Sequence, residues 1–398
     1  MTEVYLDHAA TTKLSKEALG AMLPYLLNEY GNPSSQYSIG ERARKAVTKA
    51  REQIAAALWC SPEEIYFTSG GTEADNWAFE LAVSGERTGQ ILVSQIEHPA
   101  VRKKAETYEK AGLRVERIPV DENGIIILSA LEKMVGPDTR LVSVMTVNNE
   151  IGTIQPIQRI GTLLHQKSPQ ALFHTDAVQA YGHMQLDPHR SYVHLLSASA
   201  HKFGGPKGTG FLYIEKSVKQ RSLLKGGGQE RGMRAGTENV AGIVGMAAAS
   251  RQAYENLDMR SAYVQSLRDY LIERIENEIP FVRLNGSRIN RLYNNVNISF
   301  SYVQGKNLVA MLDMNGICCS GGAACSANKS EPSPVLMALG IPKKIAQGGL
   351  RITLGEDNTK EEMDYTVYCI KKAVQQLREN NPLYSRFSEY NLHHLSNG

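Results

Sequence analysis

Leu195-Leu196-Ser197-Ala198-Ser199-Ala200-His201-Lys202 is the stretch of sequence that decides the fold. Five residues typical of a buried strand lead almost directly into a lysine, and two glycines follow it. A lysine amine at the end of a buried strand is poorly hydrated, so it can act as a nucleophile and form a Schiff base with a carbonyl cofactor. A solvated lysine is the alternative interpretation, and Lys207 competes for the same role.

Short apolar runs alternate with helix-length segments on the N-terminal side of this stretch. The runs cover residues 65–68, 91–94, 113–117, 141–147, 171–175 and 195–199, and we expect each to be a strand buried on both faces. Helical patterns cover residues 100–111 and 157–166. Such alternation predicts an α/β fold with a largely parallel sheet between layers of helices.

The two ends of the chain have different patterns. Near the start, Ser15 can cap a helix whose apolar positions Ala18, Leu19, Met22, Leu23 and Leu26 predict one buried face. From residue 258 the pattern predicts a long helix to 278, a strand at 296–301, a helix near 307–314 and a strand at 350–354. Thr359 and Glu362 form a capping box for a last helix. We therefore expect a large α/β domain over residues 15–257 and a smaller α+β domain over residues 1–14 and 258–398.

Composition excludes several classes of protein. The 398 residues carry a net charge of only +3 without a basic run, so we expect no direct nucleic-acid partner. No apolar run approaches the roughly 18 residues that a membrane span needs, and no secretory signal begins the chain, so we expect a soluble cytoplasmic protein. Three of the five cysteines crowd at Cys318, Cys319 and Cys325. Their spacing lacks the paired pattern of zinc sites, which favours a reactive thiol and predicts no metal.

Two other strand ends carry suggestive residues. After residues 65–68 the chain continues Ser69-Gly70-Gly71-Thr72, where free N–H groups at a helix start could bind a phosphate; an ordinary tight turn is equally consistent. After residues 171–175 come Asp176 and, three residues later, Gln179. A carboxylate there could pair with a protonated ring nitrogen, although it could also simply cap a helix. Together with Lys202 these are the parts that pyridoxal phosphate enzymes use.

The chain resembles a known family closely at this point. The motifs that carry the resemblance, from residue 5 to about residue 380, are Tyr5-Leu6-Asp7-x-Ala9-Ala10-Thr11-Thr12, Gly31-Asn32-Pro33-Ser34-Ser35, Thr68-Ser69-Gly70-x-Thr72-Glu73-x-Asp75-Asn76, Val147-Asn148-Asn149-Glu150-Ile151-Gly152, Ser199-x-His201-Lys202, residues 226–237 and Gly322-x-Ala324-Cys325. They look like those of the cysteine desulfurases of the NifS/IscS type, which are class V, fold-type I pyridoxal phosphate enzymes.

The resemblance implies a role for each matched residue. Lys202 would bind pyridoxal 5'-phosphate covalently, Asp176 would pair with the ring nitrogen and Gln179 would contact the ring hydroxyl. The residues expected to hold the phosphate are Gly71, Thr72, Ser199, His201 and, from the partner subunit, Thr237. His98 would stack on the ring and move protons. Arg351 would bind the substrate carboxylate with its planar guanidinium, and Asn149 would lie beside ring and substrate, with Asn148 left open as an alternative.

The function implied by the resemblance is conversion of L-cysteine to L-alanine by a homodimer, with the sulfur left as a persulfide on Cys325. Cys318 or Cys319 is the alternative nucleophile. A sulfur-acceptor protein, such as an iron–sulfur scaffold or a tRNA-thiolation enzyme, would then take the sulfur, and the tail from Asn381 onward would dock it. The competing functions are a selenocysteine lyase or aminotransferase of class V, and an inactive sulfur-relay scaffold.

Overall fold

A seven-stranded mixed sheet forms the larger part of the computed structural model, which describes residues 3–83, 85, 88–321 and 332–384. The strands lie in the order β2 (Ile65–Thr68), β8 (Gly210–Ile214), β7 (Leu195–Ser199), β6 (Leu172–Asp176), β5 (Thr139–Ser143), β3 (Gln90–Ser94) and β4 (Arg114–Ile118). β8 runs antiparallel to β2 and β7, while the pairs from β7 to β4 are all parallel. The predicted α/β class with a mainly parallel sheet is therefore confirmed.

The strand predictions differ from the structure in three places. The predicted strand 141–147 ends at Ser143, although the amides of Val144 and Thr146 still donate to the carbonyls of His174 and Asp176 in β6. The predicted strand 113–117 is not buried on both faces, because β4 is the edge of the sheet and Arg114 is exposed. β8 was not predicted from the sequence, although all five of its residues are buried. β2 and β7 begin and end at the predicted residues.

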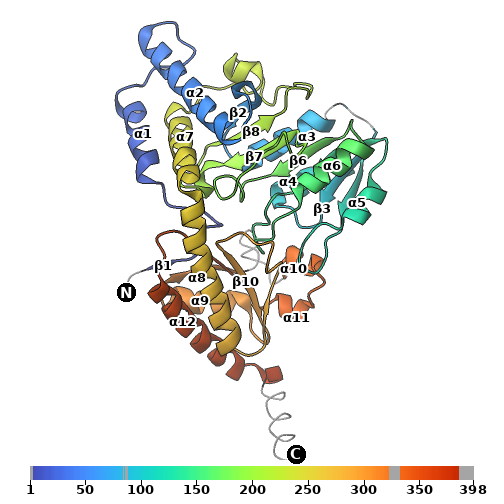
Figure 1. Cartoon of the computed structure of the whole chain (residues 1–398), viewed down its shortest axis with the longest axis vertical. Coiled ribbons are helices and arrows are strands. Elements are labelled where there is room, and N and C mark those ends of the chain that lie inside the picture. Colours follow the sequence, from blue (N-terminus) through green and yellow to red (C-terminus); the bar gives the residue numbers. More distant parts are fainter. Residues whose placement is uncertain (1–2, 84, 86–87, 322–331, 385–398) are drawn as a thin grey trace, which may run out of the picture.

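Helices pack around this sheet (Figure 1): α1 (Lys16–Leu27), α2 (Ser38–Ala57), α3 (Gly71–Val83), α4 (Pro99–Lys110), α5 (Leu128–Met134), α6 (Ile157–Lys167) and α7 (Val240–Glu255). Ser15 caps α1 as predicted, because its Oγ accepts from the amide of Ala18 at 3.1 Å. The predicted buried face of α1 is confirmed at Ala18 and at the half-buried Met22, and is wrong at the leucines. Ala18 alone is fully buried, while three of the leucines, Leu19, Leu23 and Leu26, are 43–56% exposed.

A smaller, antiparallel sheet follows the long helix α8 (Leu257–Glu278), which continues from α7 and packs against α12 (Lys360–Glu379) (Figure 1). Its strand order is β12 (Ser320–Gly321), β13 (Gly349–Thr353), β10 (Asn295–Phe300) and β9 (Val282–Leu284). The helices α9 (Gly305–Asp313), α10 (Pro334–Ala338) and α11 (Lys343–Ala346) complete this part. The predicted capping box at Thr359 and Glu362 is present.

The N-terminal strand β1 (Val4–Tyr5) pairs in parallel with β11 (Ile317–Cys318). This pairing supports assigning residues 1–14 to the smaller domain with residues 258–398, and residues 15–257 to the larger one; the division itself stays a prediction. Among the helices that the structure describes, none is long and apolar enough to cross a membrane.

Candidate active site

A cavity of about 230 Å³ opens where the carboxyl ends of β6 and β7 meet the start of α3 and the smaller sheet. Parallel strands leave such a crevice at their carboxyl ends, where ligands bind in open α/β sheets. The cavity is lined by every predicted site residue except Thr237 and Cys325: Gly71, Thr72, His98, Asn149, Asp176, Gln179, Ser199, His201, Lys202 and Arg351. Residues distant in sequence thus face one space.

Lys202 ends the short helical turn η2 (Ala200–Lys202) that follows β7. Its Nζ donates to the backbone carbonyls of Ala9 at 2.7 Å and Ala10 at 2.8 Å. These carbonyls come from the N-terminal segment, which the sequence did not indicate as part of the site. Lys207, the competing candidate, is exposed and does not line the cavity.

Asp176 is the last residue of β6 and is buried, with an exposed fraction of 3%. One carboxylate oxygen accepts from the backbone amide of Val178 at 2.9 Å. Burial raises the pKa of Asp176, while the nearby His98 and Lys202 and this amide lower it again. Gln179 donates from Nε2 to the carbonyl of Ala9 at 3.0 Å. The carboxylate therefore lies in a poorly solvated position, where it can form an ion pair with a cationic ring nitrogen.

The start of α3 provides free backbone N–H groups beside the cavity, since α3 begins at Gly71. Glycine is required there, because a Cβ atom would lie 2.6 Å from Cγ2 of Val178. His201 is held through Nδ1 by the hydroxyl of Thr11 at 3.1 Å. Burial and the neighbouring Lys202 lower the pKa of His201 to about 4, so its ring is neutral near pH 7. This end of the cavity suits a phosphate held by N–H and O–H donors.

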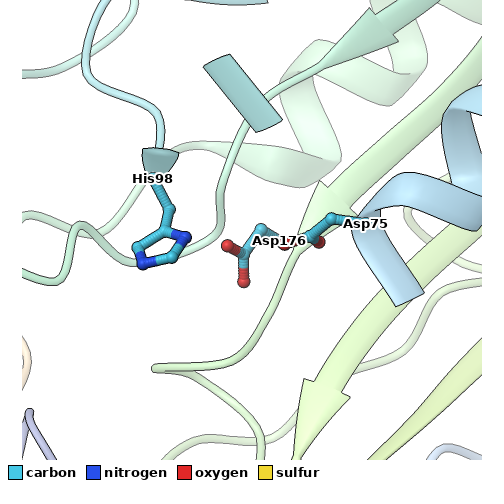
Figure 2. Close-up of side chains that lie close together, drawn as sticks. All are labelled: Asp75, His98 and Asp176. Carbon is cyan, nitrogen blue, oxygen red and sulfur yellow. The ribbon is translucent and has the colours of Figure 1, made fainter. Parts of the chain in front are cut away.

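His98 caps α4, because its Nδ1 accepts from the amide of Ala100 at 3.2 Å. Burial lowers the pKa of His98, so the ring is mainly neutral near pH 7. Since Nδ1 accepts, the proton of the neutral ring is on Nε2. Figure 2 shows the ring beside Asp176. Nε2 is thus the ring nitrogen left to exchange a proton with a ligand.

Arg351, in β13, is only 2% exposed, and its guanidinium is held from two sides. Nη1 donates to the carbonyl of Asn149 at 2.8 Å, and Nη2 donates to the Asp7 carboxylate at 2.8 Å. Within the described part of the chain, Nε is buried and has no hydrogen-bond partner. A buried unpaired donor costs roughly 1–3 kcal/mol, and because the side chain also lines the cavity, this guanidinium is suited to pair with a ligand carboxylate.

The structure distinguishes Asn149 from Asn148. Asn148 is buried, donates to the carbonyl of Ile96 at 2.8 Å and accepts from the amides of Glu150 and Ile151. Its amide group is therefore used to form the turn, while Asn149 lines the cavity.

The two remaining predicted residues lie away from the cavity or outside the described chain. Thr237 is exposed before α7 and lines a separate pocket with Thr68 and Ser69. Cys325 falls in residues 322–331, outside the described residues. Burial raises the pKa of Cys319 to about 12, and burial also raises that of Cys318, so neither is a thiolate near pH 7.

Sequence reasoning missed five residues that line the cavity: Ala9, Ala10, Asp75, Met145 and Val178. Asp75 belongs to a matched motif. Its chemical importance depends on the burial of its side chain, which the sequence does not show. Ala9 and Ala10 contribute through backbone carbonyls, which no side-chain pattern reports.

Comparisons with known proteins agree with this geometry. The family described as Aminotransferase class-V matches residues 4–366. A cysteine desulfurase IscS of Clostridium botulinum is 46% identical over 389 residues, covering 97% of this chain and 98% of that protein. A solved structure named NifS-like protein superimposes with a TM-score of 0.89 at 38% identity, covering 94% of this chain and 100% of that one. A structure described as SspA in complex with cysteine reaches a TM-score of 0.78 at 31% identity, covering 90% of this chain and 100% of that one.

These matches span nearly the whole chain and include both the central sheet and the smaller domain region. Coverage is equally high on the side of the relatives, so no large part of them is missing here. The chain belongs to the class-V aminotransferase family and, within it, to the cysteine desulfurases of the IscS and NifS type.

Proposed function

We propose that the protein converts L-cysteine to L-alanine with pyridoxal 5'-phosphate bound at Lys202, and leaves the sulfur as a persulfide on Cys325. The observation that carries the proposal is the single cavity that Lys202, Asp176 and Arg351 share. These three groups supply an amine for a carbonyl, an anion for a ring nitrogen and a guanidinium for a carboxylate. An amino acid and a pyridine aldehyde are the ligands that need all three.

The residues around the cavity fit the cofactor. Gly71 allows a close approach that a side chain would block, and the first N–H groups of α3 are available for a phosphate. Asp176 is a buried carboxyl without a cationic hydrogen-bond partner among the described residues, and a protonated ring nitrogen would supply one. When bound, pyridoxal phosphate supplies an electron-withdrawing ring that takes up the electron pair of the broken Cα–H bond of cysteine.

The chain's own residues bind the substrate and move its protons. Arg351 binds the cysteine carboxylate from the wall of the cavity, and the backbone carbonyl of Asn149 orients its guanidinium. Lys202 lines the same cavity, so its amine would hold the cofactor and would be available as a base for the substrate Cα proton. His98 exchanges a proton through Nε2, because its Nδ1 is occupied by the start of α4. Each role follows from which atoms remain available.

Sulfur transfer needs no external oxidant. The thiolate of Cys325 attacks the sulfur of cysteine, the Cβ–S bond breaks, and its electron pair stays with the carbon skeleton, which takes up a proton and becomes alanine. Cys325 keeps the transferred sulfur as a persulfide. The assignment of this step to Cys325 rests on the sequence, and the raised pKa values of Cys318 and Cys319 support it.

We further propose a homodimer that passes sulfur to an acceptor protein. The exposed leucines Leu19, Leu23 and Leu26 of α1 form an apolar row that a second copy would cover. Exposed Thr237 would then be free to reach the partner's phosphate site. The acceptor, an iron–sulfur scaffold or tRNA-thiolation enzyme, would dock at the tail after Asn381, of which residues 385–398 lie outside the described chain.

The test is to incubate purified protein with L-cysteine and a thiol reductant. We expect alanine and sulfide in equal amounts, together with a persulfide on Cys325 in mass spectra recorded before reduction. A keto acid product instead of alanine would indicate an aminotransferase. Absence of any product from protein that contains the cofactor would indicate an inactive relay scaffold. Faster turnover of L-selenocysteine than of L-cysteine would indicate a selenocysteine lyase.

A further inference from the structure

Asp75 lies in the second turn of α3 and lines the same cavity as Asp176, although none of the proposed steps uses it. Its side chain is 1% exposed. Within the described residues, its Oδ1 is buried without a hydrogen-bond partner. The hydroxyl of Ser197 is a side-chain hydrogen-bond partner of Asp75, but it is neutral and leaves Oδ1 unpaired. Burying a carboxylate with an unpaired oxygen carries a large free-energy cost, so the protein must keep this group neutral or pair Oδ1 with something in the cavity.

The groups around Asp75 show whether its carboxyl is paired or kept neutral. His98 and Asp176 each have a side-chain atom that lies within 4.8 Å of a carboxylate oxygen of Asp75. Figure 2 shows the carboxyl of Asp176 between the His98 ring and Asp75. His174, on β6, brings Nε2 to 3.6 Å from the Asp75 carboxylate. Burial lowers the pKa of His174 to about 3, and its two nitrogens are bonded to serine hydroxyls, so it carries no charge.

The other charged groups around Asp75 do not neutralise it either. Glu97, before α4, is a second buried acid whose Oε1 accepts from the amide of Met145 at 2.7 Å. Lys202 directs its amine to the carbonyls of Ala9 and Ala10. Asp75 therefore faces acids and a neutral histidine rather than a cation.

Two adjacent buried carboxyls cannot both ionise cheaply, and their surroundings differ. Asp176 accepts from a backbone amide and lies near the amine of Lys202, and both favour its anion. Burial raises the pKa of Asp75 well above its ordinary value, and the negative charge of Asp176 raises it further. The proton thus belongs on Asp75.

We propose that Asp75 is a positioning residue: its carboxyl stays protonated and offers its O–H to Asp176, so that Asp176 alone is the anion facing the cofactor ring. This rests on the proposed function only for the identity of the ligand, because the protonation of Asp75 is a property of the chain itself. A neutral donor behind Asp176 would fix the orientation of its carboxylate without adding a second negative charge beside the ring nitrogen.

The first experiment detects the proton. The infrared spectrum of the wild-type protein at neutral pH should contain a protonated-carboxyl C=O band that is lost in Asp75→Asn. Burial also raises the pKa of Glu97 well above its ordinary value, so Glu97→Gln, at the matched buried acid, should lose a different band and retain the one assigned to Asp75. If Asp75→Asn keeps every protonated-carboxyl band of the wild type, the proposal is wrong. This measurement does not depend on the cofactor or on activity, so it separates the proposal from the proposed function.

The second experiment detects the positioning role through the cofactor. Asp75→Asn keeps an N–H donor, so we expect cofactor affinity and the pH dependence of its visible absorbance to match the wild type. Asp75→Leu has no donor, and we expect at least about tenfold weaker cofactor binding and a shifted pH dependence of the absorbance. Equal behaviour of the two variants refutes the role. If Asp75→Leu does not fold, a shifted absorbance profile in Asp75→Asn refutes it instead.

Discussion

Replacement of Arg351 by lysine tests the substrate-binding end of the cavity most directly. Lysine keeps a positive charge that can still pair with Asp7, but it loses the flat fork that could grip a carboxylate with two parallel bonds. Hydrogen bonds to charged groups contribute about 1.5–3 kcal/mol each, and the substitution removes one of two. We therefore expect the KM for L-cysteine to rise about 10- to 150-fold.

The assay is steady-state alanine formation at varied L-cysteine, with cofactor affinity measured in parallel. Cysteamine, which is cysteine without its carboxylate, provides the critical comparison. Its binding, followed through the visible absorbance of the bound cofactor, should be equal in wild type and variant. Arg283→Lys, an exposed arginine on β9 of the same sheet, is the matched control and should leave all of these values unchanged.

Two results would refute the reasoning. An unchanged KM for L-cysteine would mean that another group holds the carboxylate. A similar loss of affinity for cysteine and for cysteamine would mean that Arg351 only supports the fold of the cavity, through Asn149 and Asp7.

Three further predictions follow from the site. Lys202→Ala should lose the visible absorbance of the bound cofactor while remaining folded, whereas Lys207→Ala should keep both the absorbance and the fold; the reverse pattern would exchange their roles. Mixed dimers of Lys202→Ala with Thr237→Ala should regain part of the activity that each homodimer lacks, and purified mixed dimers without activity would contradict shared sites. Burial raises the pKa of Glu150 from 4.5 to about 7, so the folded protein holds a proton there that the unfolded chain releases. As the pH rises from 5 to 8, the wild type should therefore lose stability relative to Glu150→Gln, by at most about 3 kcal/mol in urea titrations. A stability difference that does not change with pH would contradict this prediction.

The central sheet could be predicted because short runs rich in apolar residues alternate with helix-length segments, and strands such as β7 are buried along their whole length. The predicted face of α1 was right at Ala18 and Met22 and wrong at the three leucines, because a helix pattern reports an apolar stripe but not how much of it is covered. In the described chain α1 packs closely on α7, with Met22 against Gly245, where a Cβ would lie 2.5 Å from Cγ of Met22. β8 was missed because its sequence does not indicate that the chain runs back between β2 and β7.

The site was predictable to the extent that it uses side chains in motifs. Asn149 could be separated from Asn148 only after the turn was seen, because both are amides and only hydrogen bonding distinguishes them. Asp75 was invisible as a buried acid, since burial is decided by the packing of α3 against the sheet. The carbonyls of Ala9 and Ala10 belong to the backbone, and their position depends on pairing with a distant strand.

That pairing also governs when the site can assemble during synthesis. Val4 is registered with Ile317, Asp7 bridges to Thr353, and the carbonyl of Ala9 accepts from Lys202. Residues 4–7 therefore find these partners only after residues 317–353 have been synthesised, because contacts separated by hundreds of residues form late. The larger sheet can form earlier, but the segment that carries the Ala9 and Ala10 carbonyls is fixed beside Lys202 only when the strands of the smaller domain have been made. Assembly of the lysine site is thus coupled to synthesis of the smaller domain.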